Sequence, residues 1–162
     1  MLIVFLAKYL IALPVILAVC YAFVTSRKRE FITYAVLVFI VSYALAFVAG
    51  HLYYNPRPFV VENVAPLVAH AADNGFPSEH TLLVAAIAAI VTPFAPLLGA
   101  FLWLLALLVG LGRVLALVHH PIDIIASLLI AIFSAFVVWR LRSLGGPHLA
   151  VGPPNFNKGH QK

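Results

Sequence analysis

Charge and cysteine are what this sequence has least of. Of its 162 residues, 10 are Lys or Arg and 5 are Asp or Glu, so charged residues make up 9% of the chain. Soluble domains carry about 25% charged residues. The mean hydropathy of +1.09 agrees with this shortage, which excludes an ordinary soluble domain and indicates a membrane-embedded protein. The single cysteine, Cys20, excludes an internal disulfide.

Long apolar runs fill most of the chain and predict an all-α integral membrane protein. About 20 apolar residues cross a bilayer as a helix. We therefore expect a bundle of about five transmembrane helices, over about 2–24, 31–49, 77–92, 97–118 and 121–140. Residues 1–144 then form a transmembrane domain, and residues 145–162, rich in Gly, Pro and polar residues, form a polar cytoplasmic tail.

The basic residues predict how this bundle is oriented. They follow the first apolar run and the last one, which is typical of cytoplasmic positions under the positive-inside rule. This pattern favours a first transmembrane helix over a cleaved signal peptide, and it accounts for the net charge of +5 without nucleic acid. We expect the N-terminus outside, the C-terminus inside, and the proline-rich loop over 51–76 on the extracytoplasmic side. The basic residues concerned are Arg27, Lys28, Arg29, Arg140 and Arg142.

Ionisable residues also gather between the last two apolar runs, in the stretch 110–123, GLGRVLALVHHPID. Such groups are costly inside a bilayer, so they point to a functional site. Arg113 and His119 are six residues apart and cannot share a helix face, which places His119 past the end of its helix. His119 and Asp123 are four apart, so the carboxylate can hold one imidazole nitrogen and leave the other free as a nucleophile.

Two further polar patches are expected at the same membrane depth. One is Pro56-Arg57-Pro58, and the other is FPSEHT over 76–81, which contains Ser78 and His80. Guanidinium groups bind phosphate oxygens in pairs and stay charged when partly desolvated. The starts of the helices at 77 and 121 add free N–H groups that favour anions. The combination favours phosphate chemistry.

These motifs resemble those of the type-2 phosphatidic acid phosphatase superfamily, integral-membrane lipid phosphatases related to vanadium haloperoxidases. Arg57-Pro58 is similar to the end of the first family motif, and Arg113, His119 and Asp123 match the third at the family spacing. The second motif is matched over 77–80 except that Glu79 replaces a glycine. FPSEHT and HHPIDIIAS resemble the bacitracin-resistance type of undecaprenyl-diphosphatase. The resemblance covers roughly residues 45 to 130.

The resemblance implies a double displacement without a metal or another cofactor. His119 attacks the terminal phosphorus, and Asp123 steadies the imidazolium. His80 protonates the leaving oxygen and then activates water. The substrate is a polyprenyl diphosphate in the membrane, and its phosphate oxygens are held by Arg57, Arg113 and Ser78.

The sequence departs from the family pattern at two positions. The family lysine falls at Gly50, and the serine before Arg113 is Gly112. His51, next to Gly50, and the more remote Lys8 are two possible substitutes for the lysine. Glu79 either shapes the pocket or faces solvent.

Other functions stay open at this point. One is a phosphatase for phosphatidic acid or phosphatidylglycerol phosphate, and another is a non-catalytic lipid or anion transporter that uses the arginines for binding. A metal site is a further alternative, built from His51, His80, His119 and His120. His120 is interpreted as a neighbour of the catalytic histidine, and His70, Glu62 and Asp73 as ordinary loop residues.

Overall fold

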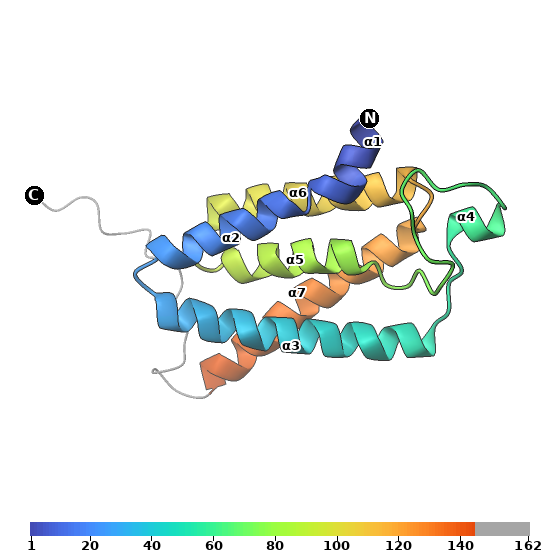
Figure 1. Cartoon of the computed structure of the whole chain (residues 1–162). Helices are drawn as coiled ribbons and strands as arrows, with labels where there is room; N and C mark the ends of the chain where they lie inside the picture. Colours follow the sequence, from blue (N-terminus) through green and yellow to red (C-terminus); the bar gives the residue numbers. More distant parts are fainter. Residues whose placement is uncertain (145–162) are drawn as a thin grey trace, which may run out of the picture.

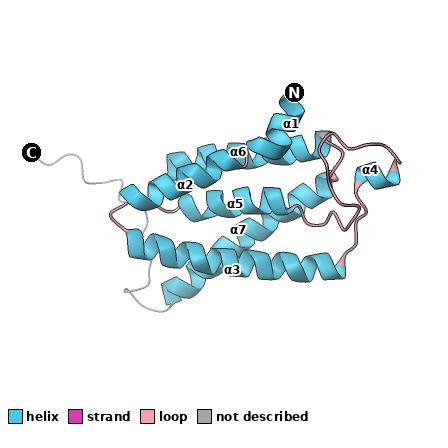
Figure 2. Cartoon of the chain, in the orientation of Figure 1, coloured by secondary structure: helices cyan, strands magenta, loops and turns pink. Residues whose placement is uncertain are grey.

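The computed structural model describes residues 1–144, and the predicted tail over 145–162 lies outside this part. The regular secondary structure of the described residues is helical, apart from an isolated bridge between Pro56 and Asn74 in the loops. Figures 1 and 2 show the helices as an elongated bundle with the loop around α4 at one end. The elements are α1 (Leu2–Val4), the π-helical turn η1 (Phe5–Tyr9), α2 (Ala12–Val24), α3 (Lys28–Leu52), α4 (Pro58–Val61), α5 (Glu79–Val91), α6 (Pro96–Leu115) and α7 (Pro121–Leu144).

The predicted all-α membrane bundle is confirmed. Within residues 1–144, three helices are long and apolar enough to cross a membrane, namely α3, α6 and α7. The N-terminal pair Leu2–Tyr9 and Ala12–Val24, bent by 43°, makes a fourth when it is counted as one broken span. The helix predicted over 77–92 is α5, which has 13 residues and is shorter than α3, α6 and α7. By length and composition, residues 1–144 therefore contain three or four candidate spans rather than about five.

Helix α5 forms the centre of the bundle, where it packs against α2, α3, α6 and α7 (Figure 1). After its first two residues it carries no charge, and most of its side chains are small or branched aliphatic ones. Small side chains let neighbouring helices approach closely. Ten of its residues are buried: Thr81, Leu82, Val84, Ala85, Ala86, Ile87, Ala88, Ala89, Ile90 and Val91.

The helix ends near the polar residues differ from those predicted. Helix α6 ends at Leu115 rather than at 118, because Leu117 has a φ of 61° that a helix cannot continue through. His119 therefore lies outside the helix, as expected. Helix α3 continues to Leu52, so Gly50 and His51 lie on its last turn and not in the loop. Helix α5 begins one residue after Ser78, its N-cap.

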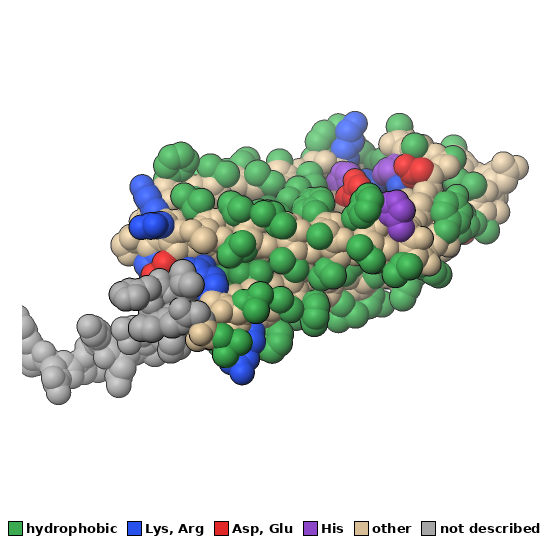
Figure 3. Space-filling model, turned by 90° about the horizontal axis from the view of Figure 1, so that it is seen from below, with side chains coloured by type: hydrophobic (Ala, Val, Ile, Leu, Met, Phe, Trp, Pro, Cys, Tyr) green, Lys and Arg blue, Asp and Glu red, His purple; other side chains and the backbone are tan. Residues whose placement is uncertain are grey.

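The two ends of the bundle are chemically different. At one end the N-terminal segment, the loop after α3 and the α6–α7 connection share a small hydrophobic cluster that includes Ala7, Val68 and Val118. At the other end Arg142 donates to the Glu30 carbonyl over 3.3 Å. Figure 3 shows many hydrophobic side chains on the face between them, with the histidine side chains gathered toward the right-hand end.

Candidate active site

His119 lies in the connection between α6 and α7 and is 2% exposed. Its Nδ1 is 2.8 Å from the Gly75 carbonyl oxygen, which can only accept, so Nδ1 carries the proton. Its Nε2 then holds a lone pair. Two guanidinium nitrogens point at this atom, Arg57 Nη1 at 3.3 Å and Arg113 Nη2 at 3.4 Å. The side chain is thus set as a neutral nucleophile facing two cations.

Asp123 lies at the start of α7 and is fully buried. Its Oδ2 is 3.4 Å from His119 Nδ1, farther than the Gly75 carbonyl. The same oxygen accepts from the His120 backbone N–H at 2.8 Å, and Oδ1 accepts from Asn55 Nδ2 at 2.7 Å. The buried carboxylate is therefore satisfied by several donors, and it shares the imidazole proton with a backbone carbonyl.

The two arginines are anchored by groups far away in the sequence. Arg57 donates from Nη1 to the Val118 carbonyl at 2.8 Å and from Nε to Asp73 at 2.7 Å. Arg113 donates from Nη1 to the Ala7 carbonyl in the π-helical turn, at 3.4 Å. Its buried Nε has no hydrogen-bond partner within the described chain. Because buried donors are normally paired, Arg113 retains capacity for an anionic ligand.

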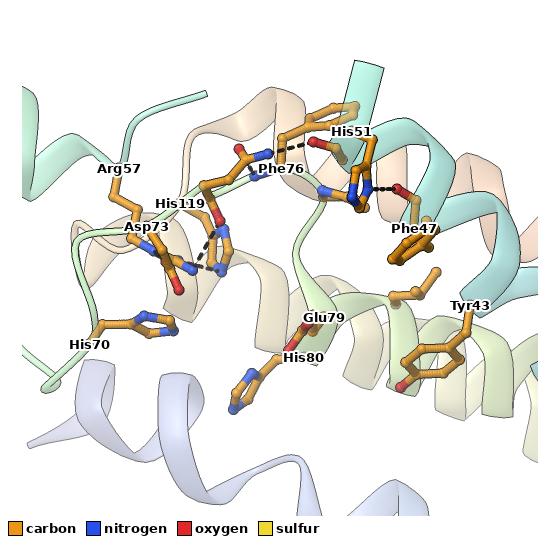
Figure 4. A pocket seen from close by; sticks show the side chains of 15 residues that line it. Tyr43, Phe47, His51, Arg57, His70, Asp73, Phe76, Glu79, His80 and His119 are labelled. Carbon is orange, nitrogen blue, oxygen red and sulfur yellow. Dashed lines mark hydrogen bonds and ion pairs between the residues drawn. The ribbon is translucent and has the colours of Figure 1, made fainter. Parts of the chain in front are cut away.

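A cavity of about 550 Å³ opens beside these groups (Figure 4). The loop before α5, the start of α5 and the end of α3 line it together. Of the predicted site residues, the cavity brings together Arg57, Glu79, His80 and His119, with His51 at its edge on α3. Four histidines thus border one space, the fourth being His70, which the sequence did not single out.

Ser78 is placed differently from the residues that line the cavity. It is fully buried, and its hydroxyl donates to Thr81 Oγ1 at 3.2 Å and caps α5 by accepting from the Thr81 N–H. Its backbone joins the second motif to the third, since its N–H donates to the Asp123 carbonyl and its carbonyl accepts from the Ser127 hydroxyl. A phosphate-binding role for the Ser78 hydroxyl stays a prediction.

The position of the family lysine has little room for a side chain. A Cβ at Gly50 would lie 3.0 Å from the Phe76 carbonyl oxygen, tighter than an ordinary contact. Of the two proposed substitutes, His51 lines the cavity, with Nδ1 donating to the Phe47 carbonyl at 2.8 Å. Lys8 instead lies over the Tyr9 ring, 5.4 Å from its centroid, and is not among the described residues lining the cavity.

The loop groups of the site have shifted pKa values. Burial lowers the pKa of His119, and the Arg113 and Arg57 charges add to this, against the raising effect of Asp123. Burial and the same two arginines lower the pKa of His70. For Asp73, burial raises the pKa, but the hydrogen bond and charge of Arg57 outweigh it and hold it below its usual value. His119 and His70 are therefore neutral at pH 7, and the Asp73 carboxylate is ionised.

Several residues of this region were missed or misjudged from the sequence. Asp73, interpreted as an ordinary solvated loop charge, is indeed in a loop with its side chain 60% exposed, but it also pairs with Arg57, which the sequence did not reveal. Asn74 fixes the loop by donating to the Gly50 carbonyl and accepting from the Asn55 and Phe76 N–H groups. A Cβ at Gly75 would lie 3.1 Å from the Asn55 carbonyl oxygen, so this turn needs glycine. The Asn-Gly pair just before FPSEHT was the available signal.

Gly112 marks a second close approach. A Cβ there would lie 2.6 Å from Leu6 Cβ and 2.8 Å from the Ala7 nitrogen. The missing side chain lets the π-helical turn lie directly on α6, which brings the Ala7 carbonyl to Arg113. Glycine in place of the family serine therefore makes room for the N-terminal segment against α6.

The alternative of a metal site finds no support in the geometry. Across residues 1–144, no three His, Cys, Asp or Glu side chains are grouped so that they could hold a metal ion. The cavity histidines border the space separately, and His120 Nε2 is 3.1 Å from the Pro56 carbonyl, to which it donates.

The fold and this arrangement of arginines and histidines are those of a membrane phosphatase, and comparison with known proteins agrees. The profile of the PAP2 superfamily matches residues 31–145. The chain belongs to the PAP2 superfamily, and it is a multi-pass membrane hydrolase homologous to undecaprenyl-diphosphatases. The predicted family and the predicted enzyme class are both confirmed.

Individual relatives cover most of the chain. It is 38% identical over 148 residues to the bacitracin transport permease protein BcrC of Bacillus licheniformis, covering 89% of this chain and 72% of that protein. It is 32% identical over 145 residues to the undecaprenyl-diphosphatase BcrC of Bacillus subtilis, covering 89% and 75%. The crystal structure of Aquifex aeolicus LpxE matches with a TM-score of 0.70, 26% identity and 84% coverage of each chain.

Proposed function

We propose that this protein hydrolyses the terminal phosphate of a polyprenyl diphosphate, such as undecaprenyl diphosphate, through a phosphohistidine. The observation that carries the proposal is the convergence of Arg57 and Arg113 on the unprotonated Nε2 of His119. A phosphorus atom approaching this nitrogen brings its oxygens within reach of both guanidinium groups. The names of the relatives, which are undecaprenyl-diphosphatases, supply the lipid class.

In the first step, His119 Nε2 forms a bond to the terminal phosphorus while the bridging P–O bond breaks. The two arginines stabilise the charge on the equatorial oxygens. His80, which lines the same cavity, gives a proton to the leaving phosphate of the lipid. The Nδ1 proton of the imidazolium stays between the Gly75 carbonyl and Asp123.

In the second step, water attacks the phosphorus of the phosphohistidine and the N–P bond breaks. His80 takes the proton from this water, which restores its starting state after inorganic phosphate leaves. His119 returns as a neutral ring with its proton on Nδ1. The cycle uses only groups of this chain and the attacking water.

The test is phosphate release from undecaprenyl diphosphate by purified protein, compared side by side with phosphatidic acid and phosphatidylglycerol phosphate. His119→Ala should abolish release, and the wild-type protein quenched in alkali should carry an alkali-stable phosphoryl group that His119→Ala lacks. A strong preference for a glycerolipid monophosphate would replace the proposed substrate by the alternative one. Full activity of His119→Ala would refute the mechanism.

A transport function is the second candidate, because one relative is named a bacitracin transport permease. If hydrolysis is the function, we expect production of this protein in a sensitive bacterium to raise bacitracin tolerance through turnover of a lipid diphosphate. His119→Ala separates the two functions: it should lose the tolerance if hydrolysis is the cause, whereas tolerance that survives this change would favour transport.

We also propose that the site faces the extracytoplasmic side, with the N-terminus outside and residue 144 near the cytoplasm. The support is the basic end of the bundle opposite the cavity, with Arg27 in the α2–α3 turn and Lys28 and Arg29 at the start of α3. Ala71→Cys in a Cys20→Ala background should react with an impermeant maleimide from outside, and Ser26→Cys should react only after the membrane is opened. The reverse labelling pattern would invert the orientation.

A further inference from the structure

A diphosphate substrate carries a second phosphate, for which the three matched motifs provide His80 alone, at the oxygen that leaves. The arginines point at His119 Nε2, where the terminal phosphate reacts. The second phosphate, which leaves with the lipid, carries its own negative charge and lies farther from His119 in the cavity. A further donor for its other oxygens has to come from another part of the cavity wall.

His70 lies where such a donor is needed. It lines the cavity from the loop between α4 and α5, and its ring centroid is 6.1 Å from that of His119, with the rings 78° apart. In Figure 4 the labelled rings of His70 and His80 lie on the same side of His119. At this centroid separation the ring nitrogens stay farther apart than the about 2.7–3.2 Å that a hydrogen bond needs between donor and acceptor atoms.

His70 also has an unused polar atom. Its Nδ1 is buried and makes no hydrogen bond of ordinary geometry within the described chain, although the backbone of Ala71 lies close enough to favour the charged ring. The corresponding nitrogens of His51 and His119 are both bonded to backbone carbonyls. Because a buried polar atom is normally satisfied, the exception beside a cavity that Arg57 also lines indicates a place for a ligand.

The charges around His70 suit a phosphate better than a cation. Burial and the positive charges of Arg57 and Arg113 lower its pKa, so the ring is neutral before substrate arrives. A bound diphosphate offsets these positive charges and favours an N–H on each ring nitrogen. His70 then becomes a stronger donor at the moment when the second phosphate is present.

We propose that His70 binds the non-reacting phosphate of a diphosphate substrate and so favours lipid diphosphates over lipid monophosphates; this rests on the proposed function. His70 is a specificity residue in this scheme, because it touches the phosphate that leaves with the lipid and not the phosphorus under attack. It provides a phosphate donor in a cavity whose Gly50 position holds no side chain.

Binding of two inorganic probes tests the assignment without turnover. Calorimetry on the full-length protein in detergent compares pyrophosphate with orthophosphate. We expect His70→Ala to weaken pyrophosphate binding about tenfold, as loss of one charge-assisted hydrogen bond implies, and to leave orthophosphate binding within about twofold. His70→Gln, which keeps an N–H donor, should recover part of the loss, and the neighbouring exposed Leu67→Ala should match the wild type.

Three results would overturn the assignment: His70→Ala weakens the binding of both probes equally, it weakens the binding of neither, or the wild-type protein does not bind pyrophosphate. A turnover experiment separates failure of the His70 assignment from failure of the proposed function. If the wild-type protein releases no phosphate from lipid diphosphates, the proposed function fails. If it does, and His70→Ala keeps the wild-type ratio of kcat/KM for farnesyl diphosphate over phosphatidic acid, only the role of His70 fails.

Discussion

Serine at position 112 is the residue that the family motif leads one to expect, yet we predict that Gly112→Ser damages this protein. The new Cβ would lie 2.6 Å from Leu6 Cβ, about 0.8 Å inside the 3.4 Å at which ordinary contact begins. It would also lie 2.8 Å from the backbone nitrogen of Ala7. Because backbone atoms are involved, the π-helical turn has to move as a unit.

The size of the effect follows from this displacement. Overpacking of a tight contact costs about 1–3 kcal/mol, and the better helix propensity of serine over glycine offsets about 0.5 kcal/mol. A shift of several tenths of an ångström also lengthens the bond from Arg113 to the Ala7 carbonyl, which is already 3.4 Å. Since a misplacement of about 1 Å can cost about 100-fold, we expect kcat/KM to fall about 10- to 100-fold.

Thermal unfolding in detergent and phosphate release from a lipid diphosphate measure the two effects. Leu111→Ser is the matched control, because it places serine one residue earlier on α6 at a side chain that is 50% exposed. The control should keep kcat/KM within about twofold, since it leaves the contact with η1 intact. If Gly112→Ser matches this control in both melting temperature and activity, the N-terminal segment does not position Arg113.

Three further predictions concern the loops. The pKa of the His119 ring should lie below the ordinary value of about 6.5, because burial and two arginines disfavour its charged form. NMR titration, with the ring signal assigned by His119→Gln, measures this pKa, and a midpoint above about 6.5 would contradict the reasoning. Asp73→Asn should tighten orthophosphate binding about twofold at low ionic strength, by removing a negative charge beside Arg57, and calorimetry should find that the gain fades in salt. Asn55→Ala should lower stability by about 1–3 kcal/mol in thermal unfolding, because the buried Asp123 loses a donor; an unchanged melting temperature would show that water replaces the amide.

The local geometry of the third motif is the part of the site that the sequence predicts best. Arg113, His119 and Asp123 are close in the chain, and helix geometry alone places His119 beyond the end of its helix. The structure puts it there, 3.4 Å from one arginine nitrogen. The spacing is informative here because the fixed rotation per residue of a helix determines which of these side chains can share a face.

Contacts between distant segments could not be predicted in the same way. The Gly75 carbonyl holds the His119 proton, and the Ala7 carbonyl holds Arg113, yet neither depends on a side chain that a pattern could reveal. The role of Asp73 depends on the path of a loop that brings it back to Arg57. Sequence patterns name the reactive groups, whereas the backbone atoms that orient them appear only once the chain is folded.

The shortness of α5 has a consequence for how deep the chemistry lies. Its 13 residues span about 20 Å, whereas the hydrocarbon core of a bilayer is about 30 Å thick. The two ends of α5 therefore cannot both reach a membrane surface, and where an end falls short, the surrounding helices shield its polar groups from the lipid. A bundle built around a short central helix carries a polar recess below the surface of the bilayer. A head group that stays attached to its lipid can enter such a recess without its hydrocarbon chain leaving the membrane.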